Sequence, residues 1–338
     1  MKTVKIAYTG MPEGFNPYGN LIYDQLKAHG YDVQITEDAD FLICHFSDMD
    51  HLDFYGKPQV RIMYSNENFI PDLNLVDYII SPYPVQLGDR CFQLPPCVWP
   101  SERWFSLPKK DRNYTQEFVK NKPYFANFIC SHESEHNIRG DFFKKLCEYK
   151  RVESAGTYLN NTGSTVSWLD GSKTELQRKC KFTLCFESTY QYGFVTEKIM
   201  DAFAADTIPI YYGSPTAAEI FNKDAFINAA DYDSFDEVIE KIKELDQDDE
   251  KYLAMLRQPI LVDPQKPQQL EEEFGRFICH IFDQPPEKAY RRSRVYYAKQ
   301  MDDYMARAVD PDEISMGTLC KLMQKKIRRK AGSLFRRA

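Results

Sequence analysis

The sequence lacks the features of a membrane-embedded or disulfide-stabilised protein. No apolar run approaches the roughly 20 residues that a membrane-spanning helix needs. The N-terminal stretch MKTVKIAYTG is too short and too interrupted by lysine to act as a secretory signal peptide. The nine cysteines are odd in number, form no CxxC pair and stand partly inside apolar runs, as Cys44 and Cys130 do. These absences predict a soluble, cytoplasmic protein with reduced, buried thiols.

An excess of positive charge is also lacking outside the C-terminal end, because acidic residues outnumber basic ones there. The chain has a formal net charge of −7, yet residues 321–338, the basic tail, hold eight Lys and Arg and no acidic residue, so the remainder carries −15. Such an acidic body lacks the broad basic face that nucleic-acid binding requires, and no nucleic-acid partner is expected.

The basic tail has a pattern of its own. Met323, Ile327, Ala331 and Leu334 recur at helical spacing among the basic residues. This pattern favours a basic amphipathic helix that docks on an anionic membrane surface, which would place the protein peripherally on the cytoplasmic face of the inner membrane. The alternative is a frayed, solvated terminus, which Gly332 favours.

What is present is enough apolar sequence for two packed domains. At 338 residues, with 43% hydrophobic residues, the chain exceeds what one core usually holds. Two successive alternations of strand and helix signals predict an α/β fold with an open, mainly parallel sheet in each half. Strands are expected at 4–9, 31–35, 41–46, 60–64 and 76–80, then at 124–130, 182–186, 208–212 and 225–227. Helices are expected at 21–29, 139–149, 174–179, 196–205 and 235–245.

The same pattern predicts domain boundaries. An N-terminal α/β domain is expected over residues 1–122, and its last part, 82–122, is rich in Pro, Trp and Lys and should cross between the domains. A second α/β domain is expected over 123–265. Helices in 266–320 should pack across both halves, and the basic tail follows them.

The densest functional signal runs from Lys181 to Pro215 and predicts strand, polar loop, helix and strand. The loop 187–193 follows a strand at the carboxyl edge, where open α/β sheets bind their ligands. Thr196 can cap the next helix, whose N-terminus would attract a diphosphate. There Lys198 adds a cation, and Glu197 can accept hydrogen bonds from ribose hydroxyls. The alternative is that Glu197 only complements the helix dipole and that the nearby aromatics are core residues.

This segment closely resembles the signature of the alpha-1,3/4-fucosyltransferases, glycosyltransferase family ten, particularly of its bacterial members. That signature is approximately F-x-L-x-F-E-N-[ST], then Y-x-T-E-K and I-P-[IV]-x-x-G. Two further segments match: residues 64–72 resemble the family's Y-x-x-E-N-x-x-P-D, and residues 137–139 resemble the segment with its phosphate-binding arginine. The resemblance covers about residues 1–260.

The resemblance implies the GT-B architecture, in which two Rossmann-like domains face a cleft, with the acceptor half first and the donor half second. It implies inverting transfer of L-fucose from GDP-fucose to a hydroxyl of an oligosaccharide or lipid-linked glycan. The linkage would be α-1,3 or α-1,4, with O3 of N-acetylglucosamine as the expected acceptor atom and O4, or glucose, left open. No essential metal or other cofactor is expected, because cationic side chains and helix N–H groups can neutralise the leaving diphosphate.

The resemblance also implies roles for single residues. Glu67 matches the family's proposed general base, and its place in a polar turn after strand 60–64 supports this role. Partial burial would suit such a base, whereas the alternative is an ordinary solvated loop glutamate. Arg139 should clamp the diphosphate together with Lys198, and Glu197 should bind the ribose.

The resemblance further implies which residues complete the nucleotide pocket. Tyr192 and Phe194 would line it together with Ser188, and the stretch from Gly156 to Asn160 would contact guanine. The sequence departs from the family pattern at two of these positions, because Ser188 stands where Asn is usual and Phe194 where Tyr is usual. Serine keeps a hydroxyl but lacks the amide, and phenylalanine lacks a donor for a phosphate or sugar oxygen, whereas the fold prediction is unchanged.

Two short patterns match known metal-binding motifs, but their sequence context does not favour a metal site. The string His132-Glu133-Ser-Glu-His136 matches the H-E-x-x-H motif of zinc-dependent hydrolases, which needs both histidines on one helix face. It follows a predicted strand directly and is therefore interpreted as a polar loop. The pairs Asp38/Asp40 and Asp48/Asp50 resemble the DxD of metal-dependent glycosyltransferases, but they flank a strand of the first half and fit turn carboxylates.

Two further alternatives remain open. A GT-B transferase with another nucleotide sugar would carry the same nucleotide contacts. A non-catalytic protein that binds a nucleotide sugar would differ from an enzyme only in lacking turnover.

Overall fold

Two parallel sheets form the framework of the computed structural model, which describes residues 2–12, 14–45, 55–98, 101–133, 135–293 and 296–309. The first sheet has the strand order β2-β1-β3-β4-β5-β6, and all its neighbours are parallel. Its strands are β1 (Thr3–Thr9), β2 (Asp32–Ile35), β3 (Phe41–Cys44), β4 (Val60–Tyr64), β5 (Tyr78–Ser81) and β6 (Cys91–Gln93). All four residues of β3 are apolar and buried, which is typical of a strand covered on both faces of a parallel sheet.

The second sheet has the order β11-β10-β9-β7-β8 and is also parallel. Its strands are β7 (Tyr124–Phe128), β8 (Val152–Ser154), β9 (Cys180–Phe186), β10 (Ile208–Tyr212) and β11 (Ile227–Asn228). The central strand β9 is buried at all seven positions. The chain order reverses between β7 and β9, and such a switch point is where open α/β sheets bind ligands at their carboxyl ends.

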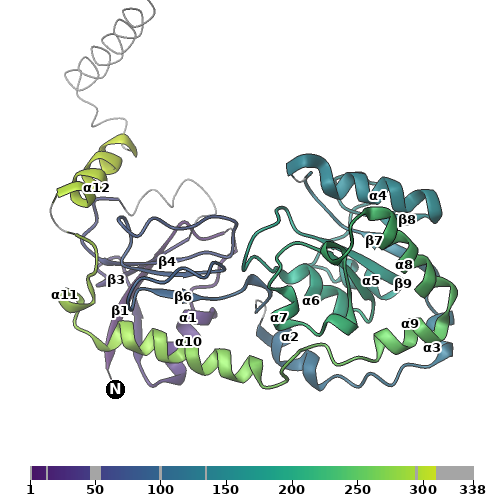
Figure 1. Ribbon diagram of the computed structural model, residues 1–338. Helices are drawn as coiled ribbons and strands as arrows, with labels where there is room; N and C mark the ends of the chain where they lie inside the picture. Colours follow the sequence, from purple (N-terminus) through teal and green to yellow (C-terminus); the bar gives the residue numbers. More distant parts are fainter. Residues whose placement is uncertain are drawn as a thin grey trace, which may run out of the picture.

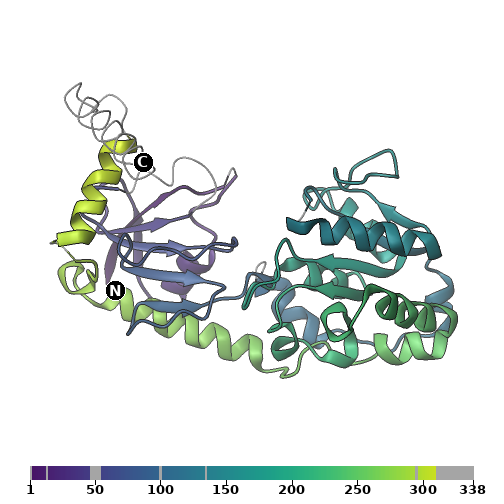
Figure 2. The same ribbon diagram turned by 45° about the horizontal axis from the view of Figure 1, so that its top comes forward.

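Helices cover both sheets, and three further helices follow the second sheet in the chain (Figures 1 and 2). With the first sheet and the crossing segment lie α1 (Leu21–Ala28), α2 (Ser101–Ser106) and α3 (Gln116–Lys120). With the second sheet lie α4 (Ile138–Tyr149), α5 (Ser172–Arg178), α6 (Glu197–Ala204), α7 (Ala217–Ile220), α8 (Phe235–Gln247) and α9 (Asp249–Leu256). The chain then forms α10 (Lys266–Asp283), α11 (Pro286–Ala289) and α12 (Tyr296–Val309). Short 3₁₀ turns lie at 96–98, 107–109, 135–137, 223–225 and 229–231.

The predicted fold class, α/β with two Rossmann-like sheets, is confirmed. Three short strands were predicted wrongly, because three-residue or two-residue strands leave no periodic signal. The segment 82–122 was predicted as a crossing but contains β6, and β8 at 152–154 lies where no strand was predicted. The strand predicted at 225–227 is β11 at 227–228, because the Asn222 side chain accepts from the Asp224 N–H and closes a 3₁₀ turn first.

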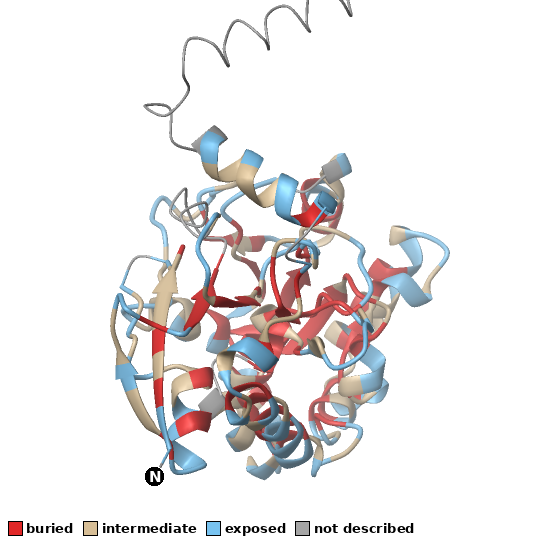
Figure 3. Cartoon of the chain, turned by 90° about the vertical axis from the view of Figure 1, so that its left-hand side faces the viewer, coloured by how far each residue is buried: buried red, intermediate tan, exposed pale blue. Residues whose placement is uncertain are grey.

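The two sheets define a first lobe (residues 2–98) and a second lobe (residues 124–256), which lie side by side in Figure 1. Buried residues follow the strands, and exposed residues follow the outer faces of the helices (Figure 3). Helix α10 packs on the first lobe through its aromatic residues: Phe282 lies 4.6 Å from Phe41, and Phe274 lies 5.3 Å from Phe92, between ring centroids. The domain boundaries at 122 and 265 stay predictions, and residues 310–338, including the basic tail, lie outside the described residues.

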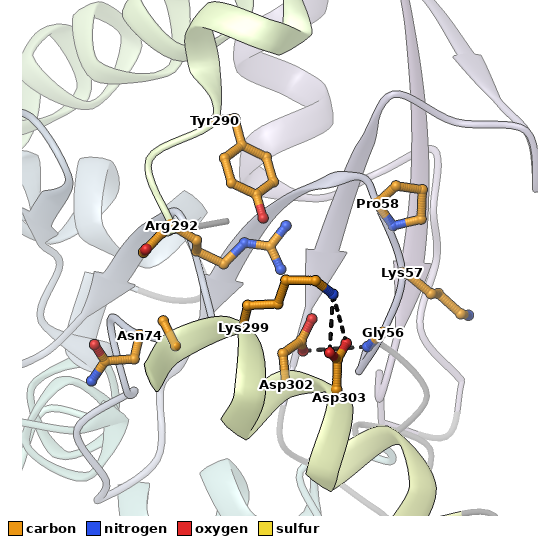
Figure 4. Close-up of a pocket in the computed structure, with 11 residues that line it drawn as sticks. Gly56, Lys57, Pro58, Asn74, Tyr290, Arg292, Lys299, Asp302 and Asp303 are labelled. Carbon is orange, nitrogen blue, oxygen red and sulfur yellow. Dashed lines mark hydrogen bonds and ion pairs between the residues drawn. The ribbon is translucent and has the colours of Figure 1, made fainter. Parts of the chain in front are cut away.

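Helix α12 is held at the amino-terminal edge of the first sheet by a buried ion pair. Arg61 of β4 is fully buried, and its two Nη atoms lie 2.7 and 3.0 Å from the carboxylate oxygens of Asp302. The Gly56 N–H also donates to Asp302, and Lys299 pairs with Asp303 on the outer side (Figure 4). Burial favours the neutral acid, but the Arg61 guanidinium outweighs it and holds the pKa of Asp302 below its usual value. Among the described residues, no helix is both long and apolar enough to cross a bilayer.

Candidate active site

The loop between β9 and α6, residues 187–196, lies where the carboxyl ends of the two sheets meet. The Cys97 N–H of the first lobe's C-terminal end donates to the Val195 carbonyl over 2.8 Å. Gly193 has φ +84° and approaches Pro82, which follows β5, so closely that a Cβ would lie 2.1 Å from the Pro82 carbonyl oxygen. Only glycine fits this position without a shift of the backbone. The loop therefore touches both lobes.

A buried carboxylate organises this loop. Glu187 is 2% exposed, and its carboxylate accepts from the Thr196 N–H (2.8 Å) and the Thr196 hydroxyl (2.9 Å). Lys198 Nζ lies 3.0 Å from the other oxygen of the same carboxylate. Thr196 is the N-cap of α6, as predicted, and its hydroxyl accepts from the Lys198 N–H. Glu187 thus fixes the position of the α6 N-terminus.

The sequence placed Glu187 in the ligand-binding loop but gave it no role. The available signal was its position directly after a fully buried, mainly apolar strand, since a carboxylate there must find partners if it is to be buried. Those partners lie nine and eleven residues further along the chain. The spacing alone did not identify them.

Lys198 and Glu197 occupy the first turn of α6, as predicted. Burial disfavours the charged lysine, but Glu187 and Glu197 outweigh it and raise the pKa of Lys198 above its usual value. Burial likewise opposes ionisation of Glu197, whereas Lys198 and Lys173 hold its pKa below the usual value. The first turn of α6 therefore presents a fixed cation and an ionised, 45% exposed carboxylate beside each other.

Arg139 lies at the same edge, in the first turn of α4. It is 5% exposed, and its Nε donates to the carbonyl oxygens of Phe186 (3.0 Å) and Glu187 (3.1 Å). Its Nη1 donates to the carbonyl of His132 over 3.3 Å. The guanidinium is therefore aligned against the end of β9, and its charge acts directly on Lys198. The structure brings Arg139, Lys198 and Glu197 together, as the sequence predicted.

The other residues predicted to contact the nucleotide differ in exposure and in hydrogen bonding. Tyr192 is 55% exposed and Ser188 is half-buried, whereas Phe194 is only 4% exposed and packs next to the contact between the lobes. Gly156 is buried against the backbone of Cys130 at the end of β7. The Asn160 side chain donates to the carbonyls of Gly156 and Ser164 and accepts from Gly163, so it shapes its own loop. Contacts of these residues with a nucleotide stay predictions.

Glu67 follows β4 at the carboxyl edge of the first sheet, as predicted. Its neighbours are tethered to adjacent segments: Asn66 pairs with His45 Nε2 over 2.9 Å, and Asn68 accepts from the Tyr83 hydroxyl. Glu67 itself is exposed, so the partial burial that would suit a general base is absent in this structure. Its carboxylate accepts no hydrogen bond from any described residue, so both its oxygens can reach a ligand.

The metal-binding motifs do not form metal sites in the described part of the chain. Residues 135–137 form a 3₁₀ turn with His136 at φ 62°, so the two histidines of the H-E-x-x-H string do not share an α-helix face. No group of three metal-ligating side chains occurs within the described ranges. Asp38 pairs with Lys5 on the surface, and Asp48 and Asp50 lie outside the described residues.

Comparisons with known proteins agree with this geometry. Residues 119–300 match the family described as glycosyltransferase family 10 (fucosyltransferase), C-terminal part, and residues 6–99 match the alpha-(1,3)-fucosyltransferase FucT N-terminal domain. The chain belongs to glycosyltransferase family 10. The resemblance stated from the motifs is thereby confirmed.

Relatives of this family 10 glycosyltransferase include the alpha-(1,3)-fucosyltransferase FucT of Helicobacter pylori, 33% identical over 225 residues. That match covers 58% of this chain and 46% of the relative, so the chain spans about half the length of that protein. A crystal structure of an alpha1,3-fucosyltransferase superposes with a TM-score of 0.69 and 27% identity, over 88% of this chain and 93% of that one. A crystal structure of alpha1,3-fucosyltransferase with GDP-fucose gives 0.62 and 26%, over 82% and 91%.

Proposed function

We propose that this family 10 glycosyltransferase transfers L-fucose from GDP-fucose to a glycan hydroxyl and forms an α-1,3 linkage. One observation carries the proposal: a carboxylate without a partner in the described chain stands at one carboxyl edge, and an arginine, a lysine and a helix N-terminus stand together at the other. Inverting sugar transfer needs these two parts, a base for the acceptor and positive charge for the leaving diphosphate. The likeness to a protein crystallised with GDP-fucose supports the choice of donor.

In this mechanism Glu67 accepts the proton of the attacking hydroxyl. The hydroxyl oxygen forms a bond to C1 of fucose from the face opposite the nucleotide, and the bond between C1 and the β-phosphate oxygen breaks with its electrons leaving on GDP. The configuration at C1 changes from β to α. Arg139, Lys198 and the N–H groups at the start of α6 stabilise the charge that develops on the diphosphate.

The charge balance of the donor edge explains why several groups share this task. Lys198 already pairs with buried Glu187, and Glu197 adds a second negative charge close to it. Lys198 alone therefore cannot neutralise a diphosphate. The guanidinium of Arg139, oriented by backbone carbonyls, and the dipole of α6 supply the rest. Glu197, ionised and partly exposed, is positioned to accept hydrogen bonds from the ribose.

For the acceptor, we propose O3 of N-acetylglucosamine, with O4, or glucose, as the alternatives. The test is to incubate the full chain with GDP-fucose and N-acetyllactosamine and to locate the new linkage by NMR. Parallel reactions with GDP-mannose and UDP-galactose examine the other nucleotide sugars. Transfer from either of these in preference to GDP-fucose would refute the donor assignment, and binding of GDP-fucose without any transfer would refute the enzyme assignment.

We further propose that the basic tail docks on an anionic membrane surface on the cytoplasmic side, where a lipid-linked glycan would be within reach. The support is its sequence alone: eight basic residues with apolar residues at helical spacing. Co-sedimentation with vesicles that contain anionic lipid should retain the full chain and release a chain that ends at residue 320. Equal retention of both chains would refute the proposal.

A further inference from the structure

An aromatic pocket lies beside the donor edge and has no role in the mechanism above. It has a volume of about 450 Å³, and its walls include Tyr190, Tyr212, Tyr232 and Phe235, with Asp233 and Ser234 at the rim. We call these six residues the aromatic pocket. The walls come from the carboxyl ends of β10 and β11, from the first turn of α8 and from the β9–α6 loop.

The aromatic pocket shares a wall with the donor site. Tyr212 is the last residue of β10, and its carbonyl accepts from the Glu187 N–H over 2.8 Å. Tyr190 belongs to the same loop that carries Glu187 and Thr196. The pocket lies on the β11 side of this loop, whereas Arg139 lies on the β7 side of β9. A ligand in the pocket would therefore sit next to the reacting groups without competing for the diphosphate position.

The pocket offers exposed aromatic rings and unused polar groups. Tyr190 is 52% exposed and its ring centroid lies 5.7 Å from that of Tyr212, which in turn lies 6.4 Å from that of Phe235. Within the described residues, the three tyrosine hydroxyls and the Asp233 carboxylate have no hydrogen-bond partner. A pyranose ring matches both features, because its C–H faces pack on aromatic faces and its hydroxyls bond to carboxylates and phenols.

The charge of the pocket narrows the class of ligand. No lysine or arginine lines it, and Asp233 adds negative charge at the rim. A phosphate or an acidic sugar would be repelled there, whereas a neutral sugar ring can donate hydroxyl hydrogens to Asp233. The same charge pattern argues against the nucleotide diphosphate as the occupant.

We propose that the aromatic pocket is a subsite for a neutral pyranose ring of the acceptor glycan, remote from the hydroxyl that receives fucose. This inference rests on the proposed function. It makes the enzyme selective for extended acceptors, because a disaccharide reaches the reacting groups without filling the pocket and a tetrasaccharide fills both. Tyr190 then determines acceptor length and takes no part in the chemical step.

The test compares Tyr190→Ala with the matched control Tyr304→Ala, which removes an equally exposed tyrosine from α12 on the first lobe. We expect Tyr190→Ala to raise KM for a neutral tetrasaccharide that ends in N-acetyllactosamine by about tenfold, as loss of one stacked ring predicts. KM for the disaccharide, kcat and the Kd of GDP should change by less than about twofold, and Tyr190→Phe, which keeps the ring and loses only the hydroxyl, should raise KM for the tetrasaccharide less than Tyr190→Ala does. The control should match the parent in every assay.

Saturation-transfer NMR with the tetrasaccharide and no donor separates this inference from the proposed function. Binding that weakens with Tyr190→Ala supports the subsite, and if the parent also transfers no fucose, the transferase assignment alone fails. Unchanged tetrasaccharide binding would overturn the subsite. A weaker affinity for GDP in Tyr190→Ala would overturn it as well, because the pocket would then hold the nucleobase.

Discussion

Glu187 and Lys198 form an ion pair whose two members are buried to different degrees. Removing one member should therefore reduce the stability of the protein by a different amount than removing the other. The side chain of Glu187 is fully buried, whereas that of Lys198 is 29% exposed and has a second carboxylate, Glu197, at 3.8 Å. Removing the lysine would leave a buried anion with only the donors of Thr196. Removing the glutamate would leave a cation that can turn toward water.

Lys198→Met should therefore destabilise the protein more than Glu187→Gln does. Loss of one partner from a buried ion pair costs about 3–5 kcal/mol, which we assign to Lys198→Met. Glu187→Gln keeps the shape and loses charged hydrogen bonds, for which we expect about 1–3 kcal/mol. In a lobe of this size these values correspond to falls in Tm of roughly 10 °C and 5 °C. The double variant should be more stable than the sum of the two losses predicts, since no unpaired charge remains.

Binding of GDP separates the structural part of Lys198 from its proposed contact with phosphate. Calorimetry should show a Kd raised about 10- to 100-fold in Lys198→Met, and the same loss in the double variant although its stability is partly restored. Two results would contradict the reasoning. One is a larger fall in Tm for Glu187→Gln than for Lys198→Met, and the other is recovery of GDP affinity in the double variant.

The other predictions concern the base, helix α12 and metal. Glu67→Gln should lower kcat about 10²- to 10⁴-fold without changing the Kd of GDP, and a rate near that of the parent would exclude Glu67 as the base. Asp302→Asn should release α12 from buried Arg61, so amide hydrogen exchange in α12 should accelerate while β7 and β9 stay protected; Asp303→Asn, on the outer side, is the control. Because the pKa of Asp302 is lowered in the folded state, its stabilisation is complete above the unfolded value of about 3.9 and is lost as the pH falls through the folded value, which hydrogen exchange in acid can follow. EDTA should leave the rate of fucosyl transfer unchanged after the metal content is checked, and a rate restored only by an added divalent cation would refute metal independence.

The features predicted correctly from the sequence are those with local causes. Strand β9 is apolar at five of its seven positions, and the N-cap of α6 is a threonine before two charged residues. Each of these depends on neighbours within a few positions of the chain. The long motif around β9 and α6 also predicted the strand, the loop and the capped helix that the structure shows at this edge of the second sheet.

The features that the sequence left open or missed depend on contacts between distant segments. Glu67 faces solvent because its two asparagine neighbours bond to His45 and Tyr83, which belong to other strand ends. Phe194 is buried because the loop around it meets the first lobe at Pro82, more than one hundred positions earlier in the chain. Neither partner could be named from spacing. The aromatic pocket was missed for the same reason, since its tyrosines come from three separate segments.

The motif between β9 and β10 is long and continuous because many of its residues make specific contacts. Gly193 allows the contact with Pro82, and its N–H donates to the Ser214 hydroxyl at the end of β10. Gly213 leaves room for Glu187, since a Cβ there would lie 2.5 Å from the Glu187 side chain. Glu187 in turn positions Thr196 and the start of α6. A change at any of these positions would move α6, the helix proposed to bind phosphate, relative to the first lobe, where Glu67 stands. In the proposed mechanism this loop thus sets the distance between the base and the leaving group, which is why its residues form one continuous pattern whereas Glu67 and Arg139 stand in short, separate ones.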